Sequence, residues 1–240
     1  MKFRKLPALF LSSMLASMGL FACGEDVETE DENGEKETEH DMTDEEYFGL
    51  IPGKCYGYLG HGGVEVIVEI TDGHILDGVD LLGIFYTVNE MAHRDEYVHV
   101  NDDGELVVGR RQDYSTGGHA VFDPAYLISR RPLEQTLDGP HRTTTMAENL
   151  GLHAEDSEWE VSVTIETRRP HDVPAFDEPV EAFPHLVRHS PQDEGDERVD
   201  NFSMAAGVGF VSLDLAGLPE VELVSTWTAG DEGCGSIPTD

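Results

Sequence analysis

The chain has few basic residues and very few lysines. Its 240 residues include 15 Lys and Arg, of which 4 are Lys, against 49 Asp and Glu, and the formal net charge is -34. A chain this acidic lacks the cations that bind phosphates, and anionic lipid surfaces repel it. The composition therefore excludes nucleic acid as a partner bound through phosphates. It suits solubility in high salt, where hydrated carboxylates stay solvated and their repulsion is screened.

Motifs of the common enzyme classes are also missing. The sequence has no nucleophile elbow, phosphate-binding glycine loop, dinucleotide fingerprint or zinc-protease helix motif. The triplet His93-Arg94-Asp95 matches part of a kinase catalytic loop, but the partner motifs of that loop are absent. Sequence motifs thus favour a non-enzymatic protein without deciding the point.

Histidines come nearest to a metal site. His185 and His189 in PHLVRH would face the same way on a helical turn, and His171 is near them in the sequence. Because imidazole binds transition metals, one alternative function is a metal-binding protein or metal-dependent hydrolase centred on residues 171–189. The competing interpretation is hydrogen-bonded loop histidines, since this spacing gives no complete ligand set. We predict no other cofactor.

Long apolar runs are absent except near the N-terminus. Lys2, Arg4 and Lys5 precede PALFLSSMLASMGLF, which is short for a membrane span but has the length of a signal-peptide core. We therefore predict that residues 1–22 are a signal peptide.

The predicted signal peptide ends in Leu20-Phe21-Ala22-Cys23, which resembles the lipobox of bacterial lipoprotein precursors. The resemblance implies cleavage before Cys23, a diacylglyceryl group on the Cys23 thiol and an acylated amino terminus. Each buried methylene contributes about 0.8 kcal/mol, so several acyl chains make a stable membrane anchor. Gly24 follows Cys23, which by the same resemblance favours the outer membrane. The expected location is the cell envelope.

Acidic residues dominate the stretch that follows Cys23. Of residues 24–46, 13 are Asp or Glu, none of these 23 residues is aromatic, and Lys36 is the only Lys or Arg. Such a segment buries too little apolar surface to offset the entropy lost on ordering. We predict that residues 23–46 form a lipidated, disordered tether, with an acidic partner-binding tail as the alternative.

Cysteines are scarce, and their number is informative. If Cys23 carries lipid, Cys55 and Cys234 remain as a pair in an oxidising compartment, and we expect them to form a disulfide. Such a bond would place the first and last strands of the domain close together. The alternative is two separate buried thiols.

Period-two alternation is the main signal in the rest of the chain. It predicts strands at 64–70, 80–88, 119–122, 158–168, 207–215 and 221–228, and a hairpin over 97–109 that turns at Asp103-Gly104. We predict that residues 47–240 form a single, mainly β domain. The expected architecture is an antiparallel two-sheet sandwich, with an open β-barrel as the alternative.

Helical signals are few. Asp123-Pro124 followed by AYLISRR fits a short helix with proline at its first position, which Pro132 would end. Residues 169–201 contain five prolines among acids and histidines, which predicts a long Pro-rich acidic loop. The sequence as a whole predicts a membrane-anchored envelope lipoprotein that displays a β-rich binding or structural domain, whose envelope partner or ligand it does not identify.

Overall fold

The computed structural model describes residues 42–114, 117–133, 140–150, 153–191, 197–230 and 233–238, and only the backbone at 140–159 and 191. The predicted signal peptide, Cys23 and the first part of the predicted tether lie outside these residues. Among the described residues, no helix has the length and apolar character needed to span a membrane.

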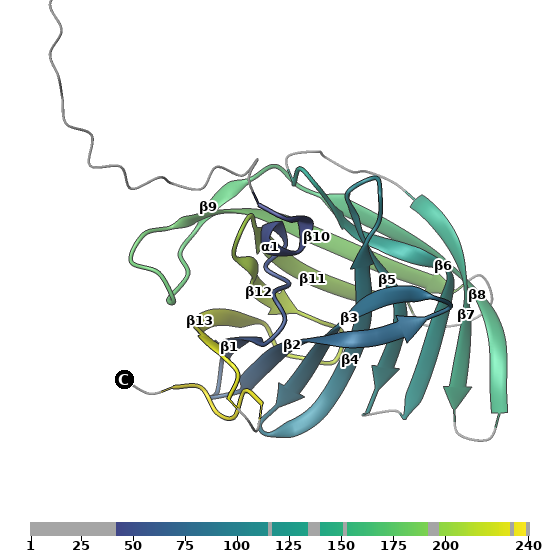
Figure 1. The fold of residues 1–240 in the computed structure, drawn as a ribbon, viewed down its shortest axis with the longest axis horizontal. Helices are drawn as coiled ribbons and strands as arrows, with labels where there is room; N and C mark the ends of the chain where they lie inside the picture. The colour runs from purple at the N-terminus through teal and green to yellow at the C-terminus, as the bar shows by residue number, and fades with distance from the viewer. Residues whose placement is uncertain are drawn as a thin grey trace, which may run out of the picture. The chain divides into compact units, whose positions relative to one another are not determined.

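The described elements are one short helix and thirteen strands (Figure 1). In chain order they are α1 (Asp44–Tyr47), β1 (Lys54–Gly60), β2 (Glu65–Leu76), β3 (Val79–Val88), β4 (Met91–Val100), β5 (Glu105–Asp113), β6 (Gly118–Arg130), β7 (Pro140–Leu150), β8 (His153–Ile165), β9 (Arg169–His171), β10 (Val180–Pro191), β11 (Arg198–Ala205), β12 (Gly209–Asp214) and β13 (Val221–Thr228).

All described strands belong to one antiparallel sheet. Their order is β11-β12-β13-β1-β2-β3-β4-β5-β6-β7-β8-β10-β9, and β10 also pairs along its other edge with β11. The prediction of a mainly β, antiparallel fold is therefore confirmed. The finer prediction of a two-sheet sandwich is not confirmed, because the pairings link the described strands into one sheet. The alternative of an open barrel stays a prediction.

Alternation along the strands sets the two faces of the sheet. On β2, Val66, Val68 and Ile70 are each at most 1% exposed, and on β8 the predicted inward residues Val161 and Val163 are buried as well. We call the face that carries these apolar side chains the inner face and the opposite side the outer face. The hydrophobic core lies on the inner face.

The predicted turn between residues 97 and 109 is confirmed. It joins β4 to β5, and Gly104 has a φ of 71°, which glycine adopts without steric cost. The side-chain oxygen of Asn101 accepts hydrogen bonds from the backbone N–H groups of Asp103 and Glu105, both at 3.0 Å. These contacts hold the turn in place.

The predicted helix after Asp123-Pro124 is wrong, because residues 123–130 belong to β6. The pairing of β5 with β6 shifts register at two places, and between Arg110 and Val108 the register partner on β6 passes from Val121 to Tyr126. Pro124 lies within this irregular stretch, where strands tolerate proline. Pairing with neighbouring strands thus overrides the local capping signal.

The predicted long loop over residues 169–201 is also wrong in its central part. It contains β9, all of β10 and the start of β11. On β10, Phe183, His185 and Val187 are buried at alternate positions, as a strand requires. Pro184 fits between them because its carbonyl accepts a hydrogen bond from the backbone N–H of Glu166 at 2.9 Å.

The two ends of the sheet-forming chain are held together as predicted. A disulfide bond joins Cys55 to Cys234, and β1 pairs with β13 so that Cys55 lies opposite Trp227. At the N-terminal end, α1 includes residues 44–46, which the sequence assigned to the tether. A capping box between Thr43 and Glu46 begins this helix.

Candidate functional site

The inner face holds a group of charged side chains within the apolar core. They are Arg94 and Glu96 of β4, Arg111 of β5 and Asp200 of β11, and each is less than a tenth exposed. Two guanidinium groups thus meet two carboxylates, and the formal charges balance. Buried charges persist in proteins when they are paired in this way. We call these four side chains the inner network.

Arg111 lies between the two carboxylates of the inner network. Its Nε donates to Glu96 Oε1 at 3.1 Å, and its Nη2 donates to Asp200 Oδ2 at 3.4 Å. Arg94 donates through Nη1 to both oxygens of Asp200, at 3.4 and 3.5 Å, and through Nη2 to the carbonyl of Ala216 at 3.4 Å. The four side chains are therefore connected across three strands.

Two buried tyrosines extend the inner network. The Tyr126 hydroxyl accepts a hydrogen bond from Arg111 Nη2 at 2.6 Å, and the Tyr86 hydroxyl donates to Glu96 Oε2 at 3.2 Å. Burial raises the pKa of both tyrosines, so both stay neutral at neutral pH. The tyrosines supply polar partners to the ions without adding charge.

Asp200 pairs with both guanidinium groups of the inner network. Burial by itself raises the pKa of Asp200, but the neighbouring His189 and the two guanidinium groups outweigh burial and hold this pKa well below its ordinary value. The backbone N–H of Ala216 also donates to Asp200 Oδ1 at 2.8 Å. Asp200 is therefore a carboxylate whose partners are all supplied by the protein.

A small cavity borders the inner network. Its volume is about 20 Å³, and its lining includes Glu96, Arg111, Tyr126, Asp200, Phe202 and Phe210. That volume has room for about one water molecule. A substrate-sized molecule does not fit in it, so we interpret the inner network as a structural part of the core.

Two of the histidines predicted as metal ligands lie on β10. The sequence prediction put His185 and His189 on a helical turn, which is wrong, but residues four apart on a strand also share a face. Both side chains lie on the inner face, 2% and 4% exposed.

Both ring nitrogens of His185 have partners. Nε2 lies 2.9 Å from the hydroxyl of Ser129, and Nδ1 lies 2.7 Å from the carbonyl oxygen of Phe183. Burial lowers the pKa of His185 to about 4, so the ring is neutral at pH 7. Nδ1 then donates to the carbonyl and Nε2 accepts from Ser129. This pair resembles a nucleophile and its base, yet Ser129 is 0% exposed and a substrate cannot reach it.

His189 and His171 have different surroundings. His189 Nε2 is 3.7 Å from Asp200 Oδ2, beyond hydrogen-bond distance, and burial lowers the pKa of His189. His171 Nε2 on β9 is 4.0 Å from Glu222 Oε1. In the described part of the chain, no three His, Cys, Asp or Glu side chains are grouped to hold a metal ion. The metal hypothesis thus stays a prediction.

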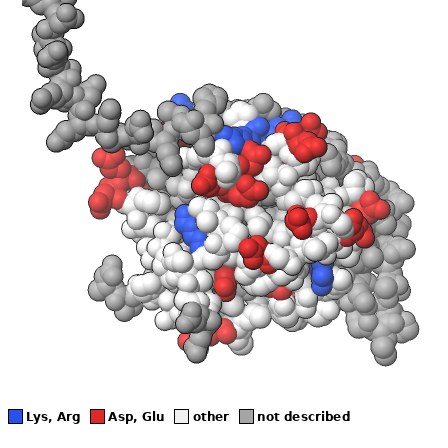
Figure 2. All heavy atoms as spheres, viewed as in Figure 1, with Lys and Arg blue, Asp and Glu red and all other residues white. Residues whose placement is uncertain are grey.

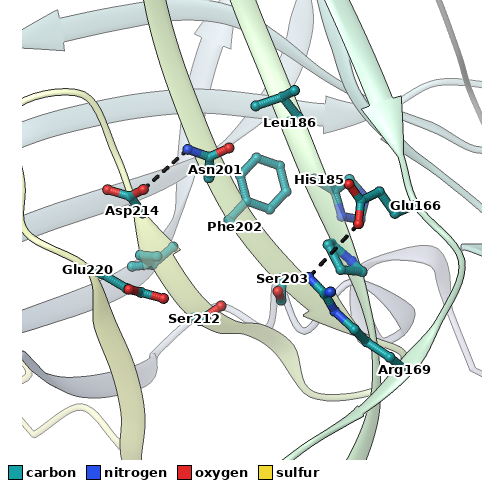
Figure 3. A pocket seen from close by; sticks show the side chains of 12 residues that line it. Glu166, Arg169, His185, Leu186, Asn201, Phe202, Ser203, Ser212, Asp214 and Glu220 are labelled. Carbon is teal, nitrogen blue, oxygen red and sulfur yellow. Dashed lines mark hydrogen bonds and ion pairs between the residues drawn. The ribbon is translucent and has the colours of Figure 1, made fainter.

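The outer face of β10, β11 and β12 carries a groove that the sequence did not indicate (Figure 3). Its volume is about 240 Å³. Figure 3 shows Asp214 and Glu220 on one side of it and Glu166 and Arg169 on the other. The groove therefore combines side chains from four separate parts of the chain.

Two serines form the floor of the groove. Ser203 of β11 and Ser212 of β12 lie directly opposite each other in the strand register, and each is 8% exposed. Neither hydroxyl has a hydrogen-bond partner among the described residues. The buried polar atoms that lack a partner do not include either hydroxyl, so solvent reaches both oxygens from the groove. The floor thus presents two accessible hydroxyls that are not bonded to the rest of the described protein.

Polar pairs border the serines. Next to them in the register, Asn201 Nδ2 donates to Asp214 Oδ2 at 3.2 Å. On the other side, Arg169 Nη2 is 3.9 Å from Glu166 Oε2, and both side chains are more than half exposed. The walls therefore offer carboxylates on both sides and a guanidinium group on one.

Acidic side chains alone do not distinguish the groove. Figure 2 shows Asp and Glu at many places on the face in view, with fewer Lys and Arg. The groove differs from the rest of this surface in its concave shape and in the two serine hydroxyls on its floor, which have no partner among the described residues.

Comparisons with protein-family models, with curated proteins and with solved structures found no match.

Proposed function

We propose that this chain is a lipid-anchored envelope protein whose β domain binds a small polar ligand in the groove on β10, β11 and β12. The proposed location is supported by the resemblance of residues 20–23 to a lipobox and by the acidic stretch that follows. The Cys55 to Cys234 disulfide agrees with an oxidising compartment.

The observation that carries the binding role is the pair of unpartnered hydroxyls of Ser203 and Ser212. Binding sites are concave and place a few polar groups where a ligand can reach them. The groove fits this description, whereas the polar groups of the inner network bind one another. A ligand that supplies hydrogen bonds to the two serines would satisfy groups that the protein leaves free.

The anchor is tested by cell fractionation. The wild-type chain is expected in the membrane fraction and released by detergent, and the full chain with Cys23→Ala is expected to lose its acyl label. Matched labelling of a Cys55→Ser variant controls for the loss of a cysteine elsewhere. Retention of acyl label by the Cys23→Ala chain contradicts the anchor.

The groove is tested by ligand-induced thermal stabilisation of the full chain in detergent. A panel of small cationic, neutral and anionic polar compounds is expected to contain at least one that raises the melting temperature. That shift should vanish in the double variant Ser203→Ala/Ser212→Ala and persist in Ser225→Ala, a serine change on β13 outside the groove lining. No shift with any compound, or a shift that persists in the double variant, contradicts the proposed binding surface.

A further inference from the structure

Resting on the proposed function, we infer that the groove selects a small hydroxylated amine, about the size of one amino sugar. Three properties of the groove set this ligand class: its accessible hydrogen-bonding atoms, their charge, and the space between them.

Acceptor atoms outnumber donors in the groove. Asn201 gives one of its two amide hydrogens to Asp214 Oδ2, which leaves one amide hydrogen as a donor and Asn201 Oδ1 and Asp214 Oδ1 as acceptors. Glu220 adds a carboxylate on the same side (Figure 3). A ligand that binds this side must therefore donate hydrogen bonds.

The charge of this side favours an ammonium group as the donor. Asp214 and Glu220 bear two negative charges, and no Lys or Arg lines their side of the groove among the described residues. Arg169 is on the opposite side, next to Glu166 at 3.9 Å. Hydrogen bonds to charged groups are stronger than neutral ones, so a cation gains more here than a neutral donor does.

The floor calls for hydroxyl groups on the same ligand. Ser203 and Ser212 can each donate one hydrogen bond and accept others, as a ligand hydroxyl also can. Their positions opposite each other on adjacent strands suit a ligand with hydroxyls on neighbouring carbons. An amine with adjacent hydroxyls therefore complements both the floor and the acidic side.

The space sets the size of the ligand. The groove volume of about 240 Å³ lies below the range of about 300 to 1,000 Å³ that is typical for drug-sized ligands. One sugar ring is therefore a better fit than an oligosaccharide. The guanidinium of Arg169, which lies 3.9 Å from Glu166, has further N–H donors that one ligand hydroxyl could contact across the groove.

The test is calorimetric titration of the full chain in detergent at 0.15 M salt, with three sugars that differ at one position: glucosamine, glucose and N-acetylglucosamine. Glucosamine is expected to bind at least tenfold more tightly than the other two, because only it carries an ammonium group. Asp214→Asn and the double variant Ser203→Ala/Ser212→Ala are each expected to raise the dissociation constant for glucosamine at least tenfold.

The matched control is Asp102→Asn, which removes one exposed carboxylate from the turn between β4 and β5. It should leave glucosamine binding unchanged. Equal weakening by Asp102→Asn and Asp214→Asn would show general attraction to an acidic surface and overturn the inference. Circular dichroism of each variant checks that it is folded.

The remaining outcomes separate this inference from the proposed function. Two outcomes would contradict the amine specificity but not the groove as a binding surface. In one, the three sugars bind equally; in the other, a compound without an ammonium group binds in a serine-dependent way and glucosamine does not. If the serine double variant leaves all binding unchanged, or if no compound binds, both the amine specificity and the proposed function of the groove are contradicted.

Discussion

The inner and outer faces of β10, β11 and β12 use polar residues in opposite ways. On the inner face, Asp200 and His185 are buried and engaged by other parts of the protein. On the outer face, Ser203 and Ser212 are nearly as well buried and have no partner among the described residues. The type of residue does not distinguish structure from function here. What distinguishes Asp200 and His185 from the two serines is that the protein itself supplies their partners.

Removing a charge tests this difference most strongly. Asp200→Asn leaves two buried guanidinium groups facing one carboxylate, and breaking a buried pair in this way lowers the free energy of unfolding by about 3 to 5 kcal/mol. Asp214→Asn, on the neighbouring strand β12 and on the outer face, should change it by less than about 0.5 kcal/mol. Urea unfolding of both variants measures the two values. Similar losses in the two variants would contradict the comparison.

The pH dependence of stability tests the neutral state of His185. Its pKa is about 4 in the folded protein and about 6.5 when exposed. Between these values the unfolded chain holds a proton that the folded chain lacks, so stability falls as the pH drops from about 6.5 to about 4. The full difference is about 3 kcal/mol.

Denaturant unfolding at a series of pH values measures this effect. His185→Gln keeps an acceptor for Ser129 and does not titrate, so its stability should depend less on pH over that interval. An identical slope in the wild type and His185→Gln would mean that His185 does not make the predicted contribution.

Serine substitutions compare the two faces directly. Ser129→Ala removes the buried partner of His185 and should lower the free energy of unfolding by about 1 to 3 kcal/mol, because Nε2 is left unsatisfied. Ser203→Ala, on the outer face, removes a hydroxyl without a partner and should change it by less than about 0.5 kcal/mol. Equal effects of these two changes on thermal unfolding would refute the distinction between the faces.

The smallest effect is expected at the exposed ion pair of the groove. Glu166 and Arg169 are 59% and 64% exposed and lie 3.9 Å apart. A double-mutant cycle with Glu166→Gln and Arg169→Gln should give a coupling energy below about 0.5 kcal/mol. A larger coupling would show that this wall is structural, as the inner network is.

Alternation and cysteine number predicted much of this fold. Val66, Val68 and Ile70 lie where their spacing placed them, and Cys55 bonds to Cys234. Local signals failed where pairing decides the outcome. Pro184 indicated a loop, yet it lies on β10, which pairs with β8 on one edge and β11 on the other. The side chains of β10 alternate between the core and the outer face, and this alternation favours a strand.

The groove was less predictable than the strands. In NFSMA the alternation puts Asn201 and Ser203 on one face, and this signal was available in the sequence. The bulge between Ser203 and Met204 sets the register that brings Ser212 opposite, and no residue pattern fixes it. The sequence also did not predict that Arg94 is buried. Arg94 and Glu96 are two positions apart on β4, so both side chains lie on the inner face with the core.

The disulfide gives the domain a limit on how far it can be stretched. Cys55 and Cys234 are 179 positions apart, so nearly the whole sheet lies inside one covalent loop. A pull applied to the two ends of the chain lengthens only the residues before Cys55 and after Cys234, and the load passes directly from one cysteine to the other. Under tension the strands of the groove stay slack and keep their shape. Only reduction of that bond exposes them to the force.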